Sequence, residues 1–100
     1  MVAKEDYLKE VETKLPKFDA DIAKLRNKLA SARNVDMTDC SKKVEDLCAR
    51  YTILRLRLQV LREKEDDRWE QRRWRIERAI RDLQKSIESV GAWVWVRSAE

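Results

Sequence analysis

The residues best suited to chemistry in this sequence are arginines and tryptophans concentrated between residues 68 and 81. Guanidinium groups bind phosphates and carboxylates, and indole rings stack on bases or lie at a membrane surface. Glu77 and Asp82 dilute the charge, so a solvated, ion-paired helix face is the preferred interpretation over a binding surface. The candidate interaction residues, two of them nearer the end of the sequence, are Trp69, Arg72, Arg73, Trp74, Arg75, Arg78, Trp93 and Trp95.

A second basic tract, residues 50–62, has no acidic residue between its first and last arginine. Its arginines form pairs seven residues apart, which places each pair on one helix face. We expect them to pair with acids of the N-terminal helix across a helix interface rather than to bind phosphate. The residues concerned are Arg50, Arg55, Arg57 and Arg62, with Glu10, Glu12, Asp19 and Asp21 as their expected partners.

Catalytic and metal-binding chemistry has few candidates. The sequence contains two cysteines, Cys40 and Cys48, and no histidine, so no Cys/His metal set can be drawn. Eight helical residues separate the thiols by roughly 12 Å of rise, too far for an internal disulfide. We expect both thiols to be buried or half-buried, with an intermolecular or redox-sensing role as the alternative. The sequence predicts that the protein is not an enzyme and has no cofactor or metal.

The composition favours long helices as the elements that carry these residues. Of 100 residues, 42% are charged and 43% hydrophobic, whereas Gly and Pro occur once each. Loops and strands need more turn residues than this. The sequence has no apolar run near the ~20 residues of a membrane span, and its start lacks the apolar core of a signal peptide. We expect one helical domain over residues 1–100, located in the cytoplasm.

A heptad repeat predicts a first helix over residues 3–33, followed by a turn over residues 34–38. The apolar positions alternate by three and four, as in a coiled-coil seam, and charged residues fill the other faces. Pro16 lies within the seam, but the repeat keeps its phase across it, so we expect one kinked helix rather than two. The seam positions are Leu8, Val11, Leu15, Phe18, Ile22, Leu25, Leu29 and Ala32.

A second seam, residues 40–61, predicts a helix that begins near Asp39. A further apolar row on the same helix, formed by Ile53, Leu56 and Val60, widens its apolar arc beyond the stripe of a two-stranded coil. We therefore expect this helix to contact two neighbours, from a third helix or from another chain.

The apolar row breaks after residue 61 and resumes from Trp69 to Val90, and this break decides the architecture. We favour a stutter within one helix over residues 39–90, because neither Gly nor Pro marks a turn. The all-α fold is then an antiparallel helical hairpin or coiled coil with a long second helix. Its far half needs another chain to cover it, which predicts a homo-oligomer, a dimer or higher. A turn within residues 64–67, with Asp67 as cap, would instead give a three-helix bundle and a monomer.

The end of the sequence predicts a helix stop and an apolar tail. We expect the helix to end near Val90, with Gly91 as its C-terminal cap. The tail, residues 91–100, alternates as a strand would, but a single short strand is not stable alone in water. We expect it to fold onto the bundle or to dock on a partner.

Several stretches resemble a group of short, largely uncharacterised bacterial coiled-coil proteins, some of them labelled stress-response proteins. The matching stretches are Lys4-Glu-Asp-Tyr-Leu, Phe18-Asp-Ala-Asp-Ile-Ala-Lys-Leu-Arg, Asp67-Arg-Trp-Glu, Ile76-Glu-Arg-Ala and Leu83. This chain departs from the group at Ile80, where members often have Trp, and in its more apolar middle helix. The resemblance covers most of the chain and implies a helical, soluble protein, with no activity or ligand residues to carry over.

These features predict a non-enzymatic structural or protein-interaction protein that self-associates through its heptad seams. The alternative is a peripheral binder of an anionic membrane surface or nucleic acid through residues 68–81. Nucleic acid is the weaker of these two, because 19 acids are interleaved with 23 bases and a dedicated binder shows a cleaner basic stripe.

Overall fold

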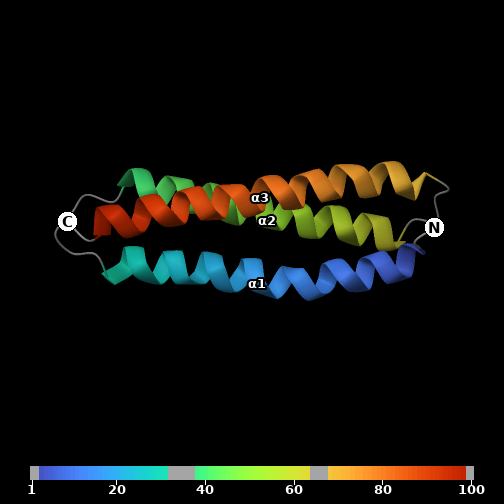
Figure 1. Ribbon diagram of the computed structural model, residues 1–100, viewed down its shortest axis with the longest axis horizontal. Coiled ribbons are helices and arrows are strands. Elements are labelled where there is room, and N and C mark those ends of the chain that lie inside the picture. Colours follow the sequence, from blue (N-terminus) through green and yellow to red (C-terminus); the bar gives the residue numbers. More distant parts are fainter. Residues whose placement is uncertain (1–2, 32–37, 64–67, 99–100) are drawn as a thin grey trace.

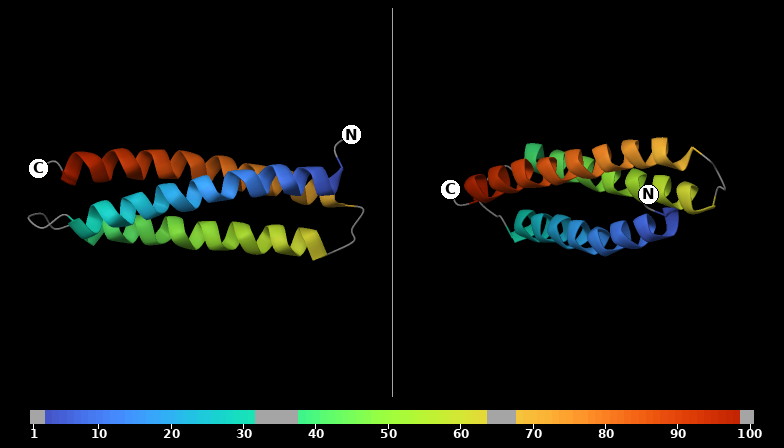
Figure 2. Two further views of the ribbon diagram at one scale, coloured as in Figure 1. Left: turned by 90° about the horizontal axis from the view of Figure 1, so that it is seen from below. Right: turned by 45° about the vertical axis from the view of Figure 1, so that its right-hand side comes forward.

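The computed structural model describes residues 3–31, 38–63 and 68–98, and these residues form three helices. The helices are α1 (Lys4–Ser31), α2 (Thr38–Glu63) and α3 (Trp69–Ser98). They lie side by side along a rod with extents of 53 × 18 × 17 Å (Figure 1). α1 and α3 run in the same direction, and α2 runs in the opposite one (Figures 1 and 2). The expected all-α class is confirmed.

The second half of the chain is two helices, so the single helix expected over residues 39–90 is wrong. α2 ends at Glu63, and α3 returns along both earlier helices (Figure 2). This return buries Ile76, Leu83 and Ile87 within one chain. Burial of one such side chain contributes ~1.5–3 kcal/mol, which a helix extending past its partner would forgo. The three-helix bundle, which the sequence left as the alternative, fits this arrangement.

The expected turns lie mostly outside the described residues. These include residues 34–37, residues 64–67 and the expected cap Asp67. At the start of α3, the backbone carbonyl of Arg68 accepts a hydrogen bond from the amide of Gln71 at 3.1 Å. The backbone carbonyl of Arg68 therefore accepts a hydrogen bond in the first turn of α3, one residue after the expected cap.

The predicted seams form the core. Every described buried side chain is apolar or aromatic, and none is charged. Two core residues, Tyr7 and Val94, fall outside the expected seams. The buried residues are Tyr7, Leu8, Val11, Phe18, Ile22 and Leu25 of α1, Cys40, Val44, Leu47, Leu54, Leu58 and Leu61 of α2, and Ile76, Leu83, Ile87 and Val94 of α3.

α1 passes through Pro16 without ending, as the unbroken phase of its seam predicted. Proline removes one backbone donor from a helix interior, and packing of the apolar face must offset that loss. Next to it, the carbonyl of Leu15 accepts a hydrogen bond from the hydroxyl of Tyr51 at 3.3 Å. This bond joins α1 to α2 close to the position where α1 lacks its own donor.

The expected helix stop at Gly91 is wrong, because α3 continues to Ser98. Gly91 has no positive φ and is therefore an interior helix residue, not a cap. The apolar alternation of residues 91–98 belongs to a helix whose inward position is Val94, which is 0% exposed. Burial of Val94 outweighs the local stop signal of the glycine, which costs about 1 kcal/mol in a helix.

Candidate functional site

The bundle leaves one apolar row of α2 uncovered. Ile53, Leu56 and Val60 are 49%, 56% and 39% exposed, although α2 contacts both α1 and α3. Their spacing places them on one helix face. The prediction that α2 has two neighbours is confirmed, but those neighbours cover its seam rather than this second row.

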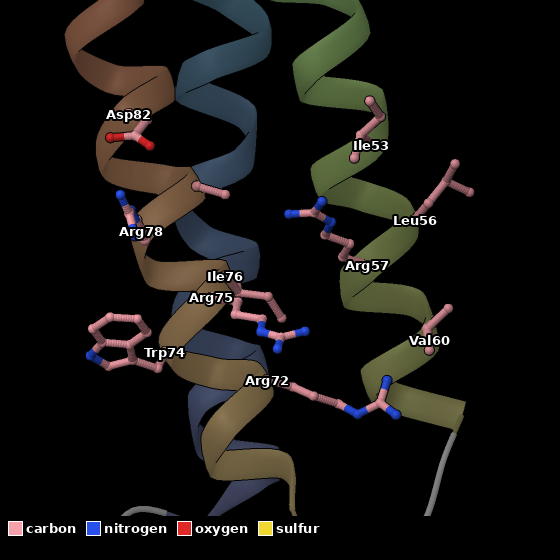
Figure 3. Close-up of a pocket in the computed structure, with 11 residues that line it drawn as sticks. Ile53, Leu56, Arg57, Val60, Arg72, Trp74, Arg75, Ile76, Arg78 and Asp82 are labelled. Atoms are coloured by element: carbon pink, nitrogen blue, oxygen red, sulfur yellow. The ribbon is translucent and has the colours of Figure 1, made fainter.

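The uncovered row lies along one side of a groove of about 620 Å³ between α2 and α3 (Figure 3). Ile76, a buried core residue, lines the groove together with Ala79. On the α3 side stands Trp74, which is 68% exposed. Leu56 projects from the side of α2 away from α3, and Trp74 from the side of α3 away from α2 (Figure 3). The groove is therefore flanked by one projecting apolar side chain on each helix. We call Leu56 of α2 and Trp74 of α3 its apolar shoulders.

Arginines occupy the space between these shoulders. Arg57 projects from α2 toward α3, and Arg72 and Arg75 project from α3 toward α2 (Figure 3). Arg78 lies further along α3 near Asp82, the one acid among the described residues that line the groove. Among the described residues that line the groove there are thus four arginines and one aspartate, so positive charge predominates.

The positive charge extends to the first turns of α3. A second hollow there is lined by Arg68, Gln71, Arg72 and Arg75, and shares two arginines with the groove. The N-terminus of a helix carries a partial positive charge, which adds to that of the guanidinium groups. Arginines therefore line both the groove and the hollow beside the first turns of α3.

Two of the candidate residues, Trp69 and Arg73, lie instead against α1. The Trp69 ring is half-buried and its centroid is 6.1 Å from that of Tyr7, with the planes tilted by 38°. The Arg73 guanidinium lies 5.6 Å from the Trp69 centroid and 5.9 Å from the Tyr7 centroid. This cluster joins the start of α3 to α1, so these two residues stabilise the bundle rather than line the groove.

Tyr7 is the one buried side chain that carries an unsatisfied polar atom among the described residues. Its side chain is 3% exposed, and its hydroxyl has no hydrogen-bond partner there. Burial raises the pKa of Tyr7 to about 12; Glu77 and Glu10 act in the same direction, and Arg73 opposes them. The phenol is therefore protonated at neutral pH. The heptad spacing did not predict burial of Tyr7, because this residue precedes the seam position Leu8.

Trp93 and Trp95 lie near the opposite end of the bundle, where lysines contact them. The Nζ atom of Lys28 is 4.1 Å from the centroid of the Trp95 ring, and that of Lys43 is 5.4 Å from the centroid of Trp93. Trp93 packs against the core, whereas Trp95 is largely exposed. Roughly 30 Å of helix separates Trp74 from these rings. The eight candidate residues therefore divide among three places, and the groove holds Arg72, Trp74, Arg75 and Arg78.

The arginines of α2 have separate roles. Arg62 pairs with Glu12 of α1, as expected. Arg50 instead donates a hydrogen bond to the hydroxyl of Ser86 on α3 at 3.0 Å. Arg57 is the member of this tract that enters the groove.

Both thiols lie on α2 and are free. Cys40 is buried and Cys48 half-buried, as the sequence predicted. Within residues 3–31, 38–63 and 68–98, no group of three or more His, Cys, Asp or Glu side chains has a metal-binding arrangement. None of the described helices combines the length and the apolar character needed to cross a bilayer.

The fold and the site together define a three-helix bundle with a basic groove flanked by apolar side chains. Comparison of the chain with protein-family models, with curated proteins and with solved structures found no match.

Proposed function

We propose that this chain is a non-enzymatic interaction protein that binds a partner helix in the groove between α2 and α3. The observation that supports this proposal is the exposure of Ile53, Leu56 and Val60 on a helix whose seam is buried. Each large aliphatic side chain left in water forgoes ~1.5–3 kcal/mol of burial, which a docked helix recovers. Their spacing of three and four residues forms an apolar stripe against which a partner helix can pack.

We place association in the groove rather than in the heptad seams. The sequence suggested self-association because residues 69–90 had no cover. α3 now covers that row against α1 and α2, and seam residues such as Leu54 and Leu83 are buried within one chain. Among the described residues, four of the six large apolar side chains that stay exposed line the groove, and the other two, Trp95 and Val96, lie near the end of α3.

A binding role without catalysis also agrees with the titratable groups. The pKa values of Tyr7 and Tyr51 are both raised, in each case mainly by burial. Catalytic acids and bases are tuned towards the working pH, whereas these shifts move the phenols away from it. The cytoplasmic location and the resemblance to bacterial coiled-coil proteins stay predictions from the sequence.

A second candidate function is charge-driven binding to an anionic membrane or to nucleic acid through residues 68–81. The hollow lined by Arg68, Arg72 and Arg75, beside exposed Trp74, favours it. Arg73 and Trp69 face α1, however, so this segment presents only part of its basic and aromatic residues on one side. Binding of this kind should fall steeply with salt, whereas apolar docking should not.

The test uses a fluorescein-labelled helical peptide with leucines along both edges of one face and glutamines between them. Fluorescence anisotropy should show binding to the intact chain. The Leu56→Ser variant should bind about tenfold more weakly, because it loses one buried aliphatic contact. Val96→Ser, at an exposed apolar position of α3 distant from the groove, should bind as the wild type does. Equal affinities for wild type and Leu56→Ser would remove the groove as the binding surface.

A further inference from the structure

We infer that the occupant of the groove is an acidic amphipathic helix of another protein, and not a second copy of this chain. This inference rests on the proposed function and adds the chemistry of the partner. Its basis is that three guanidinium groups lie between two apolar shoulders in one groove (Figure 3).

Charge argues against a second copy. A twofold dimer places the same patch of both chains face to face. Arg57 and Arg75 of one chain would then oppose their own counterparts, and Asp82 is the one acid among the described residues that line the groove. Like charges placed opposite one another suppress a pairing, whereas carboxylates opposite these arginines favour it.

The size of the apolar surface leaves a polar share of the interface to be supplied. Ile53, Leu56, Val60 and Trp74 together expose roughly 400 Å². A standard stable interface buries about 800 Å² on each partner, of which a little over half is non-polar. These four side chains are therefore close to the apolar share of one such interface, and the remainder is polar. Charge-assisted hydrogen bonds to the guanidinium groups are the interactions available to supply the rest.

The arrangement also specifies the pattern of the partner helix. The guanidinium groups of Arg57 and Arg75 lie at the centre of the groove, so acids should form the central row of the docked face (Figure 3). Glu or Asp at positions i, i+4 and i+7 makes such a row. Apolar residues on one side of it would contact Ile53 and Val60 of α2, and those on the other side would contact Ala79 of α3.

An anionic bilayer carries the same charge but has a different shape. A flat surface reaches the projecting side chains Leu56 and Trp74, whereas the groove lies between the helices with buried Ile76 among its lining residues. A helix, which is about 10 Å wide with its side chains, can enter a groove between two helices. The shape therefore favours a helix over a membrane.

The experiment compares three peptides that differ only in the central row of the face, which is Glu, Gln or Lys. Anisotropy at 50 mM NaCl should show the Glu peptide binding at least tenfold more tightly than the Gln peptide, and the Lys peptide at least tenfold more weakly. The double variant Arg57→Gln/Arg75→Gln should abolish the preference for Glu and leave binding of the Gln peptide unchanged. Arg26→Gln, at an exposed arginine of α1, is the matched control and should keep the preference.

Four outcomes would overturn the inference, and the last two of them also remove the proposed function. Equal binding of the Glu, Gln and Lys peptides would show that the partner helix need not be acidic, and the proposal that a helix docks in the groove would stand. A wild-type dimer in sedimentation equilibrium that Leu56→Ser dissociates would make the occupant a second copy. Co-sedimentation with vesicles of phosphatidylcholine and phosphatidylserine, without binding of the Glu peptide, would make it a membrane. No binding of any peptide would reject the groove as a helix site altogether.

Discussion

A Cβ atom added to Gly91 would lie 3.7 Å from the Cδ2 atom of Leu25, at an ordinary van der Waals distance. The backbone at Gly91 has no positive φ, so its helical conformation suits any L-residue. The glycine thus occupies a helix interior where a methyl group has room and a packing partner.

Gly91→Ala should therefore stabilise the protein. Alanine restricts the unfolded chain and favours the helix, which together contribute about 1 kcal/mol. For a chain of this size, that free energy corresponds to a rise in Tm of about 4–8 °C. Thermal unfolding followed by circular dichroism at 222 nm measures it. Ala92→Gly, at the adjacent exposed helix position, should lower Tm by a similar amount. A lower Tm for Gly91→Ala would mean that the contact with Leu25 is a clash.

Tyr7→Phe should raise the free energy of unfolding or leave it unchanged. It removes a buried hydroxyl that lacks a partner among the described residues, and such groups cost about 1–3 kcal/mol. Tyr51→Phe makes the same chemical change but deletes the hydrogen bond to the carbonyl of Leu15. It should lower stability by about 0.5–1.5 kcal/mol. Urea titrations compare the two, and greater destabilisation by Tyr7→Phe would contradict the assignment of Tyr7 as unsatisfied.

The stability of the protein should fall at alkaline pH, partly because of Tyr7. Its pKa is raised to about 12 in the folded chain, from an ordinary value of 10.0 in the unfolded one. The folded state therefore favours the protonated phenol, and this contribution is complete below pH 10 and lost as pH rises towards 12. The urea midpoint should drop between pH 9 and pH 11.5, and less steeply in Tyr7→Phe. Identical pH profiles for the two proteins would show that this phenol titrates normally.

The same substitution at Ile22 and at Ile53 distinguishes a core position from a groove position. Ile22 is buried in the seam of α1, so Ile22→Asp places an unpaired charge in the core and should cost about 4 kcal/mol or more. Ile53→Asp puts the same charge on the exposed row and should cost less than about 1 kcal/mol. Thermal melts measure both variants. A melting curve like that of the wild type for Ile22→Asp would show that the seam is not the core.

The heptad spacing predicted the core of α1 and α2 well. Residues such as Val11, Leu47 and Leu54 are buried where the three-four repeat places them, because that repeat depends only on helix geometry. It cannot distinguish one bent helix from two antiparallel ones, since both keep the same rows. The burial of Leu83 against the other helices decides that question, and this is a tertiary effect. The same holds for Gly91, whose local stop signal is weaker than the packing of the helix around it.

The groove was only partly predictable. The sequence indicated Trp74 as a candidate interaction residue and singled out the second row of α2, but it treated the arginines of residues 68–81 as one surface. A helical projection divides them, since Arg73 is four residues from Trp69 and shares its face. Arg72 and Arg75 lie on another face, towards α2 (Figure 3). The entry of Arg57 into the groove depends on how α2 and α3 pack, which no single-helix pattern contains.

The odd number of helices has a mechanical consequence. α1 begins at one end of the 53 Å rod, and α3, which runs parallel to it, finishes at the other (Figure 1). Tension applied between Lys4 and Ser98 therefore acts along the rod and slides α1 and α3 past each other. The side-chain contacts between α1 and α3 must then break together. In a two-helix hairpin pulled from its adjacent ends, the contacts between the helices would break one turn at a time. The bundle is thus built to resist stretching along its length.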